Sequence, residues 1–245
     1  MKKNAENAAK LTKLLKKLKQ SAEAEPVPER TALEHLIYAF LAWNTTRNQA
    51  DQAMGKLKRA TVDLNDLRVT DPIEIAEILG TRYSKAEERA ERLVMVLRGV
   101  YQLEHGMVTK TLSAMPKREA RTKLEELPGV VPFVSASVLL YGLGAHAIPV
   151  DDQLVTKLRS DGVVEEDATV EQVQSFLEQN IRAGDGLEAA QLLRVYAEAK
   201  VTLADSTKPG KKTSKAGSGR TAAKTGTSKP KTTKTTTKKK TTAKR

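Results

Sequence analysis

Residues Lys123–Leu154 read KLEELPGVVPFVSASVLLYGLGAHAIPVDDQL and form the most informative segment of the chain. It reads as a helix, a tight Pro-Gly turn, a second helix, a glycine-rich exit and a short extended piece before a helix capped by aspartate. The turn at Leu127–Val130 directs backbone N–H groups toward the start of the second helix. Such a helix N-terminus is a ready-made phosphate site. The stretch therefore predicts a helix–turn–helix unit suited to a polyanionic partner.

Apolar residues recur at helical spacing on both sides of this stretch. The clearest cases are the stripe Leu33–Leu41, the long segment Ser84–Glu104, and an amphipathic segment Asn4–Gln20 with leucines on one face and lysines opposite. Aromatic residues make up only 4% of the chain, and no clear alternating pattern is present, so an all-α fold is predicted. The other expected helices are Asn48–Lys58, a short one after Asp71-Pro72, Pro116–Glu126, Val134–Tyr141, Asp152–Arg159, Val170–Gln179 and Leu187–Leu203.

The net charge of +12 is unevenly distributed. Residues from Ser206 onward hold 14 Lys and Arg and no acid, and residues 1–20 hold seven Lys and one Glu, which leaves an acidic body with a net charge of −8. The tail consists almost entirely of Lys, Thr, Ser, Gly, Ala and Pro, so it cannot bury enough apolar surface to offset its ordering entropy. We expect a basic N-terminal helix (1–22), a helical domain (30–203) and a disordered DNA-binding tail (206–245).

Several classes of site are excluded by composition. The chain contains no cysteine, so disulfides, thiolate zinc sites and cysteine-ligated iron–sulfur clusters are impossible. The three histidines, His35, His105 and His146, lack metal-ligand spacing, and no metal site is expected. No apolar run could span a bilayer. We expect a cytoplasmic protein with no membrane partner.

The helix–turn–helix segment resembles the helix-hairpin-helix and aspartate element of the endonuclease III superfamily of DNA glycosylases. Leu127–Val130 matches that family's L-P-G-V hairpin, and Val150-Asp151 matches its V-D dipeptide. Leu33–Leu57 is similar to the family's first core helix and following turn, with Asn44 where the family often has Gln, and Tyr83–Ala86 matches a further element. The resemblance covers about residues 30–200. It implies two helical subdomains, one formed by residues 48–140 and the other by the N-terminal and C-terminal helices.

The resemblance also assigns candidate site residues. It makes Asp151 the catalytic carboxylate, which would stabilise a cationic sugar as the base leaves. An aspartate at a helix start is also an ordinary N-cap, and Asp152 beside it is expected to be a cap only. The expected DNA-binding residues are Asn44, Leu127, Gly129, Val130, Val131 and Phe133. Trp43, Tyr83 and His146 are candidates for the base pocket, with packing as the alternative for each.

The hairpin departs from the family pattern at three consecutive positions. Phe133 stands where lyase members carry a Schiff-base lysine, so no lyase activity of that type is expected. Val131 replaces the second hairpin glycine and would be strained at a positive φ, while Pro132 removes one N–H that could face phosphate. We therefore expect this hairpin to bind DNA more weakly than the hairpins of the family do. The resemblance also implies a monovalent cation bound by hairpin carbonyls at Leu127–Val130, and no other cofactor.

The sequence leaves three functions open. The resemblance implies a monofunctional DNA N-glycosylase of base excision repair, a monomer that binds double-stranded DNA in the nucleoid and flips a base into a cleft. The alternative is a catalytically inactive helix-hairpin-helix DNA-binding or chromatin-architectural protein. A third possibility, an RNA-associated protein, accounts for the tail but leaves Asp151 without a role.

Overall fold

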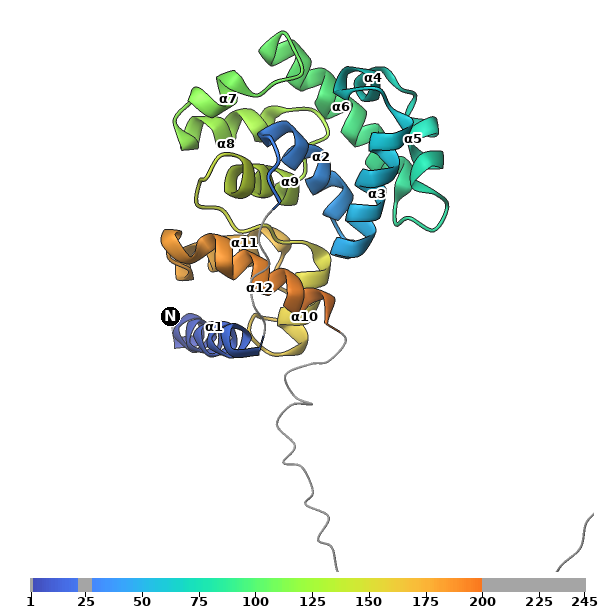
Figure 1. The fold of residues 1–245 in the computed structure, drawn as a ribbon. Coiled ribbons are helices and arrows are strands. Elements are labelled where there is room, and N and C mark those ends of the chain that lie inside the picture. The colour runs from blue at the N-terminus through green and yellow to red at the C-terminus, as the bar shows by residue number, and fades with distance from the viewer. Residues whose placement is uncertain (1, 22–27, 200–245) are drawn as a thin grey trace, which may run out of the picture. The chain divides into compact units, whose positions relative to one another are not determined.

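The computed structural model describes residues 2–21 and 28–199, and every regular element among them is helical (Figure 1). The all-α prediction is confirmed. In chain order the elements are α1 (Lys2–Ser21), α2 (Ala32–Ala42), α3 (Arg47–Ala60), α4 (Leu64–Val69), α5 (Pro72–Leu79), α6 (Ala86–Glu104), α7 (Lys110–Ala114), α8 (Lys117–Glu126), α9 (Pro132–Ser137), the π-helical turn η1 (Val138–Gly142), α10 (Asp152–Ser160), α11 (Val170–Asn180), the 3-10 turn η2 (Ala183–Asp185) and α12 (Gly186–Glu198). The predicted tail 206–245 lies outside the described residues, as does the end of the helix predicted to reach Leu203.

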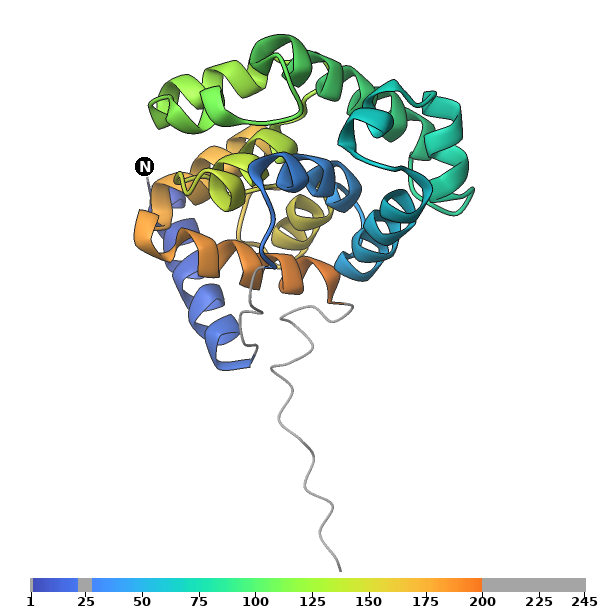
Figure 2. The ribbon, with the colours of Figure 1, turned by 45° about the horizontal axis from the view of Figure 1, so that its top comes forward.

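Helix α2 is the central element of the core. Its residues Leu36, Ile37, Phe40 and Leu41 are all at most 1% exposed, which follows from their spacing on an almost wholly apolar helix. It packs against α3, α6, α9 and η1. Figure 2 shows α2 in the middle of the described chain, with the α6–α7 region on one side and α12 on the other.

The first helix, α1, joins the C-terminal helices although it comes first in the chain. Its residues Leu11, Leu14 and Leu18 are buried, and α1 packs against α12, which in turn packs against α10. The lysines of α1 mostly occupy its exposed face. The expected pairing of N-terminal and C-terminal helices therefore holds for α1, whereas α2 packs against α3, α6, α9 and η1 instead. No helix in the described part of the chain has the length and apolar character needed to cross a membrane.

The hairpin between α8 and α9 turns at a single glycine. Gly129 has a φ of 88°, and a Cβ there would lie 3.0 Å from the backbone oxygen of Arg92, so both conformation and space require glycine. Val131 has a φ of −111° and is extended, so replacing the second hairpin glycine causes no strain. Pro132 occupies the first turn of α9, where a missing N–H costs no helical hydrogen bond.

Helix α9 continues directly into the π-helical turn η1. The two together cover the predicted helix Val134–Tyr141. At the end of η1, a Cβ on Gly142 would meet Ala32 of α2 at 3.0 Å, so the chain can pass α2 closely only with glycine at this position. The close crossing fixes where the α9–η1 segment lies against α2.

Arg89 of α6 is fully buried, an unusual place for an arginine. Its guanidinium donates to the carbonyl oxygens of Phe40, Trp43 and Ser84, at 2.8 Å for Nη2 to Trp43 and 3.0 Å for Nη2 to Ser84. Burial lowers the pKa of Arg89, but its ordinary value is high enough that it stays charged at neutral pH. A buried cation at a helix C-terminus also complements the helix dipole. Arg89 thus ties the start of α6 to the end of α2.

Replacing Arg89 should strongly destabilise the fold. Arg89→Met leaves three carbonyl groups without their donor, one in a buried and two in part-buried hydrogen bonds. An unsatisfied buried group costs about 1–3 kcal/mol and loss of a buried cation's bonds about 3–5 kcal/mol, so we expect a loss of roughly 3–5 kcal/mol in unfolding free energy. Urea denaturation followed by circular dichroism measures it. Arg92→Met on the same helix is the control, because Arg92 is one-third exposed and should cost under about 1 kcal/mol. Equal losses in the two variants would refute this role for Arg89.

Candidate functional site

The turn from α2 to α3 carries one face of the candidate site. Asn44 adopts a left-handed conformation with a φ of 54°, which Asn tolerates better than most residues. Thr46 then starts α3 with a capping box closed by Gln49. The carbonyl oxygens just before and within this turn therefore point out of the regular helical pattern and need donors from elsewhere.

Asp151 lies directly opposite this turn and is 2% exposed. Its Oδ1 accepts the Leu154 N–H at 3.0 Å as the N-cap of α10, so the cap role expected from sequence is present. Its Oδ2 accepts the backbone N–H of Asn44 at 3.2 Å. The carboxylate therefore connects the beginning of α10 to the α2–α3 turn.

Arg194 of α12 completes the surroundings of Asp151. Its Nη1 lies 2.8 Å from Asp151 Oδ2 in an ion pair whose side chains are 13% and 1% exposed. The same guanidinium donates to the carbonyl oxygens of Ala42, at 2.6 Å, and Thr45, and its Nε pairs with Glu198 at 2.9 Å. No sequence motif indicated Arg194 as a site residue. The one sequence feature that could have pointed to Arg194 is its position as a charged residue between the apolar residues Leu193 and Tyr196, both of which are buried.

Asn44 and Asp152 bind each other reciprocally. The Asn44 side chain donates to Asp152 Oδ2 at 2.8 Å and accepts the Asp152 backbone N–H at 3.0 Å. Asn44 thus satisfies a free N–H at the start of α10, as a capping residue would. Any insertion of Asn44 into DNA first breaks both hydrogen bonds.

A cavity of about 160 Å³ opens beside Asp151. Its walls come from α2, the start of α3, the α9–η1 segment, α12 and the chain just before α2. Asp151, Arg194 and Phe133 all line it, and the Arg194 guanidinium lies 5.7 Å from the Phe133 ring centre. The hairpin position that carries lysine in lyases is thus occupied here by a 7% exposed ring facing the cavity.

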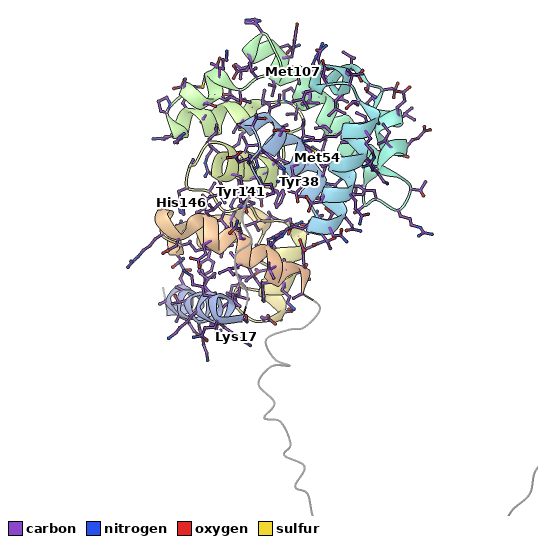
Figure 3. The ribbon with its side chains drawn as sticks, in the orientation of Figure 1. Lys17, Tyr38, Met54, Met107, Tyr141 and His146 are labelled. Atoms are coloured by element: carbon purple, nitrogen blue, oxygen red, sulfur yellow. The ribbon has the colours of Figure 1, made fainter. Side chains whose placement is uncertain are left out.

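Aromatic rings form much of the remaining wall. Tyr38 and Tyr141 line the cavity where α2 and η1 meet α12 (Figure 3), and His35 stacks on Tyr141 with ring centres 5.9 Å apart. The Arg30 guanidinium lies 3.9 Å from the Tyr38 ring centre. Burial raises the pKa values of Tyr38 and Tyr141 and lowers that of His35, so at neutral pH all three side chains are uncharged.

The three residues expected in a base pocket lie elsewhere. Trp43 is half-buried and packs near the cationic groups of Lys85, Arg89 and Arg92, and the Tyr83 hydroxyl donates to the Leu41 carbonyl oxygen at 2.6 Å. The His146 ring bonds the Glu178 backbone oxygen at 2.9 Å, near the start of α12 (Figure 3). None of the three lines the cavity beside Asp151.

The hairpin residues differ in their exposure to solvent. Leu127 is buried and Phe133 faces the cavity, whereas Gly129, Val130 and Val131 are partly exposed. Arg92 Nη1 lies 3.5 Å from the Gly129 carbonyl oxygen, so a positive charge already faces one carbonyl that the expected monovalent cation would use. The described residues also contain no group of three His, Asp or Glu side chains placed to hold a metal.

Loss of the Asp151 charge should cost stability even where its cap is kept. Asp151→Asn caps about as well, but it leaves Arg194 without its carboxylate partner. A hydrogen bond to a charged group contributes about 1.5–3 kcal/mol, and we expect a destabilisation of that size in urea denaturation. Asp152→Asn is the matched control, because that side chain is exposed and should change stability by under about 1 kcal/mol. If Asp151→Asn has no larger effect than the control, the ion pair contributes little.

Comparison with known proteins identifies solved structures that share the fold of this chain. No protein-family model matches the chain, and no curated protein sequence matches it. Among solved structures, it is similar to an endonuclease III–DNA covalent intermediate, with a TM-score of 0.65 and 17% identity over 81% of this chain and 92% of that one.

Two further solved structures are similar at the same level. A Clostridium acetobutylicum 8-oxoguanine glycosylase/lyase with DNA has a TM-score of 0.62 and 18% identity over 79% of this chain and 69% of that one. The H. pylori 3-methyladenine DNA glycosylase bound to 1,N6-ethenoadenine has a TM-score of 0.56 and 18% identity over 78% and 93%. The chain has the all-helical fold of the helix-hairpin-helix DNA glycosylases.

Proposed function

We propose that this protein is a monofunctional DNA N-glycosylase that binds double-stranded DNA as a monomer. The observation that carries the proposal is the ring-sized cavity bounded on one side by Asp151 and on another by Phe133 of the hairpin. A cavity of about 150 Å³ can hold a benzene ring, so 160 Å³ suits a base extruded from the duplex. A buried apolar cavity with a few converging polar groups is the usual form of a small-ligand site.

The reaction needs no covalent step on the protein. The C1′–N bond breaks with its electron pair going to the base, which takes a proton from solvent, while water adds to C1′ and releases a proton. Asp151 stabilises the cationic sugar that develops between these events. Phe133 has no amine, so the hairpin cannot form a Schiff base with the abasic sugar.

The Arg194–Asp151 ion pair sets a condition on this reaction. Oδ2 of Asp151 is held by Arg194 and by Asn44, and the carboxylate is 1% exposed. A sugar can approach the carboxylate only if DNA binding moves Arg194 away from Oδ2. Glu198 and the carbonyl oxygens of Ala42 and Thr45 remain as partners for the displaced guanidinium.

The same ion pair favours a second candidate, a catalytically silent DNA-binding protein. A carboxylate already neutralised by arginine contributes less to stabilising a cationic sugar. In that case Asp151 serves only as a cap and as the partner of Arg194. The surfaces that meet DNA are the same in both proposals: the partly exposed hairpin tip Gly129–Val131 and the α2–α3 turn. Both proposals place the protein in the nucleoid.

Base release by wild-type protein and Asp151→Asn separates the two candidates. On duplexes that each carry one lesion, the wild type should release free base without strand scission from at least one of them. Asp151→Asn should reduce that rate by about 10²–10³ while DNA affinity is retained, because one preorganised electrostatic group is lost. Assays run well below both melting temperatures keep the stability loss out of the comparison.

Asp152→Asn is the control for this assay and should retain activity. Borohydride should trap no covalent complex through the hairpin, and a trapped adduct mapped to that segment would contradict the absence of Schiff-base chemistry. Wild-type protein that releases no base from any lesion would favour the silent DNA binder.

The basic tail should dominate non-specific DNA affinity. Each phosphate neutralised adds roughly 0.9 to the slope of log affinity against log salt on duplex DNA, and the sequence from Ser206 onward carries 14 Lys and Arg. Removing residues 206–245 should lower both affinity and slope sharply, while the helical circular dichroism signal of the remaining chain is retained. Fluorescence anisotropy over a salt series measures the change, and an unchanged slope would show that the tail does not contact DNA.

A further inference from the structure

Helix α2 and the turn η1 bring two polar aromatic side chains together in the wall of the Asp151 cavity. The close crossing of Gly142 and Ala32 places the end of η1 against the start of α2. His35 lies one helical turn after Ala32, and its ring stacks on that of Tyr141 at an interplanar angle of 20°. Both rings line the cavity (Figure 3). The fold therefore presents the two rings to the cavity as one unit.

The other polar side chains of the lining already have partners within the protein. Asp151 and Arg194 bond each other and the α2–α3 turn, and the remaining donors of Arg194 are used on Glu198 and on carbonyl oxygens. The further side chains of the lining that have partners are those of Arg30, Tyr38, Arg47, Asp51, Ser137 and Gln191.

The His35 ring nitrogens and the Tyr141 hydroxyl differ from these groups. Within residues 2–21 and 28–199, neither side chain forms a hydrogen bond, although His35 is only 6% exposed. Buried polar groups of folded proteins almost always have hydrogen-bond partners, so two unpaired ones side by side in a cavity wall need an explanation. A ligand in the cavity that bonds both of them is such an explanation.

Both side chains are neutral at neutral pH. Burial lowers the pKa of His35 and raises the pKa of Tyr141. A neutral imidazole has one donor and one acceptor nitrogen, and a phenol hydroxyl can donate and accept. Leaving these groups unpaired costs free energy, and a ligand with matching groups removes that cost. A planar ring with a donor and an acceptor on its edge meets this requirement.

We propose that His35 and Tyr141 determine which ring the cavity accepts, by hydrogen-bonding the polar edge of a base that lies against Phe133. This inference rests on the proposed function, because it names the specificity-determining residues of the same site. The volume and the apolar walls of the cavity select a ring by its size. The two side chains add selection by the chemistry of the ring edge.

A packing role for the same two rings makes a different prediction. Tyr141→Phe and His35→Phe both keep a flat ring in the wall and remove its polar atoms. If the rings only fill space, these replacements change the binding of every ring-shaped ligand by the same factor. If the rings read the ligand edge, only ligands with a polar edge lose affinity.

NMR titration of the full-length protein with two single-ring probes separates these roles. 2-Pyridone is neutral and carries an N–H beside a carbonyl oxygen, whereas fluorobenzene is a ring of similar size without such groups. The wild type should bind 2-pyridone more tightly. Tyr141→Phe and His35→Phe should each weaken 2-pyridone binding by about two- to tenfold, the effect of one net hydrogen bond. Fluorobenzene binding should stay nearly unchanged, which also shows that the cavity of each variant is folded.

Tyr101→Phe is the matched control for the loss of a tyrosine hydroxyl. Tyr101 stacks on Arg68 and does not line the cavity, so this change should leave both affinities as in the wild type. Shift changes on titration should centre on residues of the cavity wall, such as Phe133 and Leu193. Thermal melting followed by circular dichroism checks that all variants fold.

An activity assay connects this inference to the proposed function. On a lesion that the wild type processes, both cavity variants should lower kcat/KM several-fold while DNA affinity is retained. If no lesion is processed but 2-pyridone binding still depends on both residues, the proposed enzyme activity fails while the selectivity of the cavity stands. Equal weakening of both probes in folded variants, unchanged 2-pyridone binding, or no binding of either probe by the wild type would overturn the inference.

Discussion

The C-terminal end of α2 is held by two arginines that come from two different helices later in the chain. Arg89 from α6 binds the carbonyl oxygens of Phe40 and Trp43, and Arg194 from α12 binds those of Ala42 and Thr45. A helix end leaves its last carbonyls without partners, and burial makes that cost high unless donors are supplied. The two guanidinium groups supply them and add positive charge where the helix dipole is negative.

The candidate site depends on this arrangement. Arg194 bonds the α2 end and Asp151 at once, so the start of α10 is fixed relative to the α2–α3 turn. Because the cavity lies between α2, α12 and the hairpin segment, its walls are held by the same contacts. A lysine in place of Arg194 could not make these connections, since it lacks the rigid fork of donors.

Much of the fold could be predicted from the sequence because its signals are local. Apolar spacing indicated α2 and α6, and the Pro-Gly turn indicated the hairpin. The start of α6 was misplaced by two residues, since Lys85 adopts a left-handed conformation that spacing does not reveal. The strain expected at Val131 is absent because Gly129 takes the positive φ by itself. Asp151 was found through a motif, but its partner Arg194 is 43 residues away and only the folded chain brings them together.

Whether Asp151 meets a sugar is the central question, and a structure with DNA answers it most directly. A duplex carrying a 2′-fluoro-substituted lesion nucleotide resists glycosidic cleavage and so captures the bound state. We expect the flipped base inside the cavity against Phe133, the sugar C1′ facing Asp151, and Arg194 withdrawn from Oδ2. A bound duplex with no flipped nucleotide and the Arg194–Asp151 pair intact would contradict it.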